Sequence, residues 1–186
     1  PTSPSAGGQM VYPAGFSGGS SPGIAEKNFS FQPTVLYVSQ YVKISSNWQG
    51  HPSSVNKMTY FYGQGFRPFV YTNIRGTGTG TLVSSVALQG LATAYNDGRG
   101  QTNTEVFLLP NLGPTGIIDR GKWYHFEYIL HMNTSGQSNG RVQAWLDGVK
   151  THDFSGIRFS STSTKWELMH WAPVWGGTGG TVSSTQ

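Results

Sequence analysis

The stretch from Lys122 to Met132 constrains the fold of this chain more than any other part of the sequence. Apolar residues occupy every second position from Tyr124 to Met132, and the alternate positions from Trp123 to His131 carry an indole, two imidazoles, a carboxylate and Ile129. A period of two is that of a β-strand with one buried face. We therefore expect an extended segment whose apolar side faces a core and whose other side is available to a ligand.

Shorter segments with strand character recur along the rest of the chain, separated by turns rich in glycine and proline. We expect strands at 35–44, 57–62, 69–74, 81–88, 104–109, 141–147 and 164–170. No segment shows the apolar stripe of a helix, and only 11% of the residues are charged, whereas helix surfaces normally carry many Lys and Glu side chains. The sequence therefore predicts an all-β fold, an antiparallel β-sandwich of two sheets with jelly-roll topology.

The chain of 186 residues fits one domain with a short extension. Residues 1–34 are rich in Pro, Gly and Ser and are expected to form an N-terminal arm. Residues 35–186 are expected to form a single β-sandwich domain. The stretch after Gly176 contains no clear closing strand, which favours a sheet edge that a neighbouring chain could complete.

Composition excludes several functional classes. The net charge is +4, but Lys and Arg are scattered singly, so we expect no nucleic-acid partner. No apolar run is long enough for a membrane span. The absence of cysteine excludes disulfides, thiolate metal sites and thiol nucleophiles.

Three segments carry a resemblance to a known superfamily. They are Tyr37-Val38-Ser39-Gln40-Tyr41 continuing through 42–57, Gly121–Glu127 with Gly140–Gly148, and Trp171–Gly177. Over residues 35–177 the chain resembles bacterial extracellular domains of the concanavalin A-like lectin/glucanase superfamily, which includes laminin-G-like domains and jelly-roll polysaccharide lyases. The resemblance implies a jelly roll with a glycan-related function, but it does not decide between binding, cleavage and a structural role.

The outward side of the strand at 122–132 carries the side chains of a candidate glycan site. Sugars offer apolar C–H patches and many hydroxyl groups, which flat aromatic rings and planar polar groups recognise. The candidate ligand-binding residues are Trp123, His125, Glu127, Tyr41, Lys43 and Gln143. Trp123 would stack on a sugar, Glu127 and Gln143 would bond hydroxyls, and His125 and Lys43 would favour an acidic sugar. The alternative interpretation is an ordinary outer face with a satisfied Glu–His pair.

The same residues allow a catalytic alternative. Elimination on a uronate needs a base, an acid for the leaving oxygen and a group that neutralises the carboxylate. Tyr41, His125 and Lys43 supply the first two, and Asn56 or Arg67 would supply the third. Hydrolysis by paired carboxylates is disfavoured because no expected strand carries two acids at alternate positions.

No cofactor or metal site is expected. His125 and His131 lie six residues apart on one strand, too far to share an ion. A structural calcium at the Asn96-Asp97-Gly98 or Asp147-Gly148 turn stays open as an alternative.

These observations predict an extracellular glycan-binding module without catalysis, secreted or held at a bacterial surface, with an acidic polysaccharide as the favoured partner. Two alternatives stay open. One is a structural subunit of an extracellular assembly or filament, joined to copies of itself through the N-terminal arm or a sheet edge. The other is a polysaccharide lyase acting by β-elimination.

Overall fold

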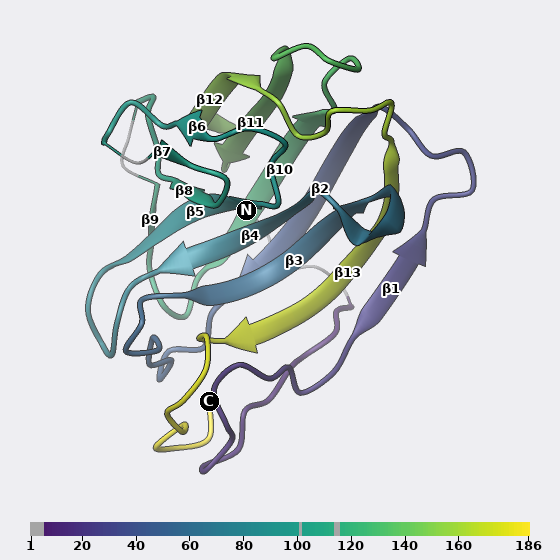
Figure 1. Cartoon of the computed structure of the whole chain (residues 1–186). Coiled ribbons are helices and arrows are strands. Elements are labelled where there is room, and N and C mark those ends of the chain that lie inside the picture. The colour runs from purple at the N-terminus through teal and green to yellow at the C-terminus, as the bar shows by residue number, and fades with distance from the viewer. Residues whose placement is uncertain (1–5, 101, 114–115) are drawn as a thin grey trace.

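The computed structural model describes residues 6–100, 102–113 and 116–186. Within these residues, most strands form two antiparallel sheets that pack face to face, as Figure 1 shows. A short two-stranded hairpin, β6 (Tyr95–Asn96) and β7 (Thr102–Asn103), lies beside them. The predicted all-β, two-sheet jelly roll is confirmed.

The larger sheet has seven strands and the smaller has four. The seven-stranded sheet runs in the order β1 (Ala25–Asn28), β13 (Trp166–Trp175), β3 (Asn56–Gly63), β4 (Phe69–Arg75), β5 (Leu82–Gln89) and β8 (Val106–Leu108), and β9 (Ile117–Ile118) also pairs with β5. The four-stranded sheet runs in the order β12 (Val149–Ile157), β11 (Gly140–Leu146), β10 (Trp123–His131) and β2 (Val35–Lys43). A single turn of 3₁₀-helix, η1 (Gln64–Phe66), connects β3 to β4.

The core lies between the two sheets, and β10 supplies its centre. Phe126, Tyr128 and Leu130 are buried, as the alternation predicted. Phe61 and Val70 of the other sheet are fully buried opposite them, and the ring centroids of Phe61 and Tyr128 lie 6.4 Å apart. Each such side chain contributes roughly 1.5–3 kcal/mol through burial, which fixes the register of both sheets. The remaining side chains therefore point outward and form two separate outer faces.

Strand β12 was missed by the sequence analysis. The Asp147-Gly148 turn, in which both residues have positive φ, joins β11 to β12. Strand β12 lacks a clear apolar alternation in the sequence because His152, which is 1% exposed, occupies a core position opposite Ala144. Burial lowers the pKa of the His152 imidazole to about 4, so this ring is neutral at neutral pH.

The described part of the predicted arm packs against the domain. Strand β1 lies within it and extends the seven-stranded sheet by pairing with β13. Tyr12 is 3% exposed, and its backbone N–H and C=O both bond to Gln186 at 2.9 Å. Ser17 forms a bridge with Thr181. The arm and the C-terminal segment thus hold each other in place beside the sandwich.

Among the residues described here, none of the helical structure reaches the length and apolarity of a membrane span.

Candidate functional site

The outer face of the four-stranded sheet carries all six residues of the sequence-predicted site. Strands β2 and β10 pair so that Tyr41 lies opposite His125, and Lys43 lies opposite Trp123. Ser39 lies opposite Glu127 in the same ladder. All five predicted residues on these two strands therefore project from one side of the sheet, as the alternation required.

Hydrogen bonds and a ring contact join the middle of this face into one network. The Tyr37 hydroxyl donates to Glu127 Oε1 at 2.6 Å, and Ser39 Oγ lies 2.7 Å from His125 Nε2. His125 Nδ1 lies 3.6 Å from Glu127 Oε2. The rings of Tyr41 and His125 stack with centroids 4.5 Å apart. The hydrogen bond to Glu127 raises the pKa of the exposed Tyr37 hydroxyl.

A second network occupies the β11–β12 end of the same face. Arg141 forms two hydrogen bonds of 2.7 Å with the Asp153 carboxylate, and Lys150 also bonds it. These cations hold the pKa of Asp153 far below its usual range. Gln143 donates to the same carboxylate at 3.2 Å and is only 9% exposed. The predicted binding residue Gln143 is thus already engaged by a neighbouring side chain.

The structure separates the residues of the predicted elimination site. Tyr41, Lys43 and His125 share the four-stranded sheet, but Asn56 begins β3 of the seven-stranded sheet and Arg67 lies in the connection from η1 to β4. Asn56 is 3% exposed, and its amide donates to the carbonyls of Ile74 and Gly76. The prediction that Asn56 or Arg67 would join His125 was therefore wrong, because Asn56 is buried in the other sheet and Arg67 lies in a connection between two strands of that sheet.

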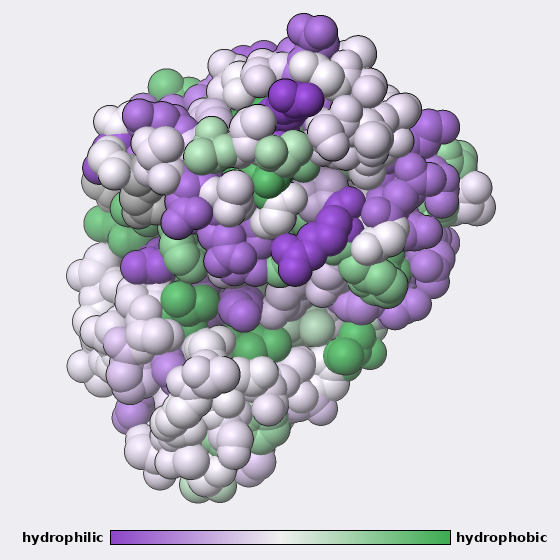
Figure 2. Space-filling model, in the orientation of Figure 1, coloured by the Kyte–Doolittle hydropathy of each residue, from purple (hydrophilic) through white to green (hydrophobic). Residues whose placement is uncertain are grey.

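The outer face of the seven-stranded sheet carries a group of aromatic rings that sequence reasoning did not select. Tyr60 and Tyr62 lie parallel with centroids 6.0 Å apart, and Tyr60 is 5.5 Å from Tyr71. Tyr71 in turn contacts Phe69 and Phe107. Figure 2 views the molecule from this side and shows strongly hydrophilic side chains next to hydrophobic ones.

Cationic side chains lie over these rings. Lys57 Nζ is 5.3 Å from the Tyr71 ring centroid, Arg75 Cζ is 4.5 Å from that of Phe107, and Arg67 Cζ is 5.5 Å from that of Phe69. Among the residues that the structure describes, no carboxylate lies within ion-pair distance of any of the three. We call Lys57, Arg75, Arg67 and the five rings the aromatic–cation face.

Burial shifts the pKa values of the lysine and the tyrosines of this face in opposite directions. It lowers the pKa of the Lys57 ammonium, because a cation loses hydration among the rings. It raises the pKa of the Tyr71 hydroxyl to about 12 and also raises that of Tyr60. Lys57 thus loses its proton more readily than an ordinary lysine, and the two tyrosines hold theirs more firmly.

A β-bulge explains why this face was missed. The β3–β4 register shifts between Lys57 and Tyr60, so these residues project from the same side despite their odd spacing. In β4, Phe69 and Tyr71 alternate with Val70 and other core residues, and both sides look apolar. The sequence did contain a signal for this face, since aromatic residues and single cations occupy positions on the same side of a strand, as Tyr71 and Arg75 do in β4.

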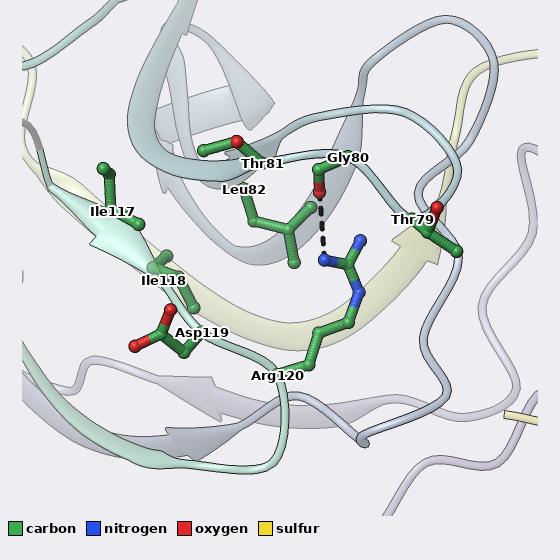
Figure 3. Close-up of a pocket in the computed structure, with 8 residues that line it drawn as sticks. All are labelled: Thr79, Gly80, Thr81, Leu82, Ile117, Ile118, Asp119 and Arg120. Atoms are coloured by element: carbon green, nitrogen blue, oxygen red, sulfur yellow. Dashed lines mark hydrogen bonds between the residues drawn. The ribbon is translucent and has the colours of Figure 1, made fainter.

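A shallow cavity of about 240 Å³ lies elsewhere, between the 79–82 loop and the 117–120 segment (Figure 3). Arg120 donates to the carbonyls of Trp48, Gly78 and Gly80. Its guanidinium is therefore occupied in joining loops, which is a structural role.

Metal ligands are not gathered in the described residues, where no three His, Cys, Asp or Glu side chains lie together. The Asp147 carboxylate, one of the two calcium candidates, accepts the backbone N–H of His125 at 2.8 Å.

Solved structures of polysaccharide lyases share this fold. Alginate lyase vAL-1 from Chlorella virus superposes with a TM-score of 0.65 and 15% identity, over 95% of this chain and 78% of that one. Alginate lyase Aly36B gives 0.62 and 14% over 94% and 74%. Endo-beta-1,4-glucuronan lyase from the fungus Trichoderma reesei gives 0.59 and 15% over 89% and 67%.

At these identities the likeness shows the fold, and the chain has the concanavalin A-like jelly roll that the resemblance implied. No family model matches the sequence. No curated protein matches it either.

Proposed function

We propose that the chain binds an acidic polysaccharide over the aromatic–cation face of the seven-stranded sheet and cleaves it by β-elimination. The observation that carries the proposal is Lys57, a half-buried ammonium that lies over a tyrosine ring and has no carboxylate partner among the described residues. The likeness in fold to alginate and glucuronan lyases supports it.

Binding follows from the composition of the face. Tyr62 and Phe69 offer flat apolar surfaces to the C–H side of a sugar ring. Arg75 and Arg67 offer planar guanidinium groups, which match a carboxylate with two parallel hydrogen bonds. The four-stranded sheet is less suited, since Glu127 bonds to Tyr37, and Asp153 already pairs with Arg141 and Lys150.

Elimination assigns one role to Lys57 and another to Arg75. Neutral Lys57 removes the proton from C5 of the uronate, the C4–O bond to the neighbouring sugar breaks, and a C4–C5 double bond forms. The leaving oxygen takes its proton from water, because Tyr71 is only 1% exposed, and Arg75 stabilises the charge that develops on the carboxylate. The lowered pKa of Lys57 raises the fraction of neutral amine near neutral pH, which a general base needs.

Two measurements test the proposal. Purified chain is incubated with alginate, with polyglucuronate and with neutral agarose, and the ultraviolet absorbance of the new double bond is followed. Binding is measured separately by calorimetry. We expect binding and absorbance with a uronate polymer and neither with agarose.

The outcomes separate the parts of the proposal. Binding of a uronate polymer without cleavage overturns the lyase activity and leaves a glycan-binding module on the same face. The absence of binding to every uronate polymer overturns both parts. We further propose that the chain acts outside the cell, where a polymeric substrate of this kind is accessible.

A further inference from the structure

Three side chains on the four-stranded sheet form a line that the proposed function does not use. Ser39 Oγ lies 2.7 Å from His125 Nε2, and His125 Nδ1 lies 3.6 Å from Glu127 Oε2. Hydroxyl, imidazole and carboxylate thus follow one another in the order of nucleophile, base and orienting group.

The partners of His125 are compatible with an arrangement of its protons that suits a base. When Nδ1 carries the proton and faces the carboxylate, Nε2 is free to accept the Ser39 hydroxyl proton. The Tyr37 hydroxyl donates to the other oxygen of Glu127 at 2.6 Å, which orients the carboxylate. In this tautomer His125 can act as a base toward Ser39.

The backbone and a neighbouring ring hold the imidazole in position. The backbone N–H of His125 donates to Asp147 Oδ1, and its C=O accepts the N–H of Asp147, both at 2.8 Å. Tyr41 stacks on the imidazole at 4.5 Å. The side chains of His125 and Glu127 keep 23% of their surface exposed, so a solvent-borne substrate can reach them.

A donor for a developing oxyanion lies beside the serine. Strand β2 is the edge of its sheet, and Met132 N–H donates to Thr34 C=O in the ladder with β10. Hydrogen-bonded pairs alternate along an antiparallel ladder, and the register from Val35 to Lys43 is unbroken. The backbone N–H of Ser39 therefore points away from β10 along the open edge, next to its own hydroxyl.

We propose that Ser39, His125 and Glu127 form a nucleophilic site that hydrolyses short acyl esters. Ser39 Oγ attacks the ester carbonyl while His125 Nε2 takes its proton. That proton then goes to the departing alcohol, which leaves an acyl group on Ser39. Water attacks the acyl-serine, His125 again takes and returns the proton, and a carboxylic acid and free Ser39 result.

The surroundings of the site point to its substrate. Tyr37 and Tyr41, exposed by 56% and 47%, flank it on an open sheet face. A long acyl chain would find aromatic edges and water there, so a short group such as acetyl fits best. The inference stands apart from the proposed lyase activity, since it uses the opposite sheet.

The test uses p-nitrophenyl acetate as the probe. The folded wild-type chain is compared with Ser39→Ala and His125→Ala, and acetylation of Ser39 is sought by mass spectrometry after rapid acid quenching. We expect each substitution to lower the rate by at least about 100-fold and the acetyl group to appear on Ser39. Circular dichroism checks that the variants fold, which is expected because Ser39 is exposed.

His131→Ala is the matched control, because it removes an imidazole from the same strand and face outside the network. It should leave the rate unchanged. Equal losses in His131→Ala and His125→Ala would reveal unspecific imidazole hydrolysis and overturn the proposal. So would a Ser39→Ala variant as active as the wild type.

Glu127 is a positioning residue in this scheme, since it acts through His125. Glu127→Gln should lower kcat while KM stays the same. A change in KM alone would contradict that role.

Discussion

The two outer faces of the sandwich place several of their charged side chains in different surroundings. On the four-stranded sheet, Asp153 bonds to Arg141, Lys150 and Gln143, and Glu127 bonds to Tyr37. On the seven-stranded sheet, Lys57 and Arg75 lie over aromatic rings. If the proposed aromatic–cation face binds the glycan, the comparison teaches that residue type alone does not mark a binding face. What matters is whether the charge already has a partner within the molecule.

The strongest way to break this comparison is to remove Lys57. Lys57→Met should lower the rate of uronate elimination by about 100- to 10,000-fold, because the general base is lost. It should not lower the melting temperature, since a half-buried ammonium is costly to the fold and a methionine is not. Absorbance assays and thermal unfolding measure the two effects.

Lys122→Met provides the control, because it removes an exposed ammonium that pairs with Asp119 in the segment between β9 and β10, outside the aromatic–cation face. It should keep full elimination activity. If Lys57→Met stayed active, the assignment of Lys57 as the general base would be wrong.

Acid should destabilise the protein through the inner side of the four-stranded sheet, where His152 is buried. Burial lowers the pKa of His152 from 6.5 to about 4. The neutral ring therefore makes its full contribution to the free energy of unfolding above about pH 6.5. That contribution, roughly 3 kcal/mol in all, is lost as the pH falls toward 4.

Urea unfolding at a series of pH values measures this loss. In His152→Leu the loss between those pH values should be smaller by that amount, because no ring is left to protonate. An identical pH profile in the variant would show that other groups cause the acid sensitivity.

The smallest effects sharpen the contrast between two arginines. Arg75→Gln should weaken binding to a uronate polymer about tenfold, or ~1.4 kcal/mol, with little change in stability. Arg141→Gln should lower stability by about 0.5–1 kcal/mol with no change in binding, because its partner is Asp153.

Calorimetry and urea unfolding on both variants complete the comparison. If Arg141→Gln weakened binding more than Arg75→Gln, the glycan site would belong to the four-stranded sheet, where the sequence analysis placed it.

Sequence patterns predicted the parts of the fold in which alternation is unbroken. Strand β10 follows a strict period of two, so its buried Phe126 and its outward His125 were both assigned correctly. In β3 the bulge after Lys57 breaks the period, and Tyr60 would have been placed in the core by counting. In β12 the buried His152 hides the strand.

The candidate site was harder to predict than the fold because partners are set by tertiary structure. Tyr41, His125 and Glu127 share a face as expected, but the sequence cannot reveal that Ser39 contacts His125 diagonally across two strands. Nor can the sequence reveal that Gln143 donates a hydrogen bond to Asp153 and is therefore already engaged.

The Arg120 side chain has a consequence for how the molecule opens. It bonds to carbonyls at Trp48, Gly78 and Gly80, in two loops that are far apart in the chain. Neither loop can detach alone, because its opening would leave a guanidinium N–H of Arg120 without a hydrogen-bond acceptor. The amides near Gly50 and Gly78, which also bond to each other, should therefore exchange with deuterium as one cooperative unit.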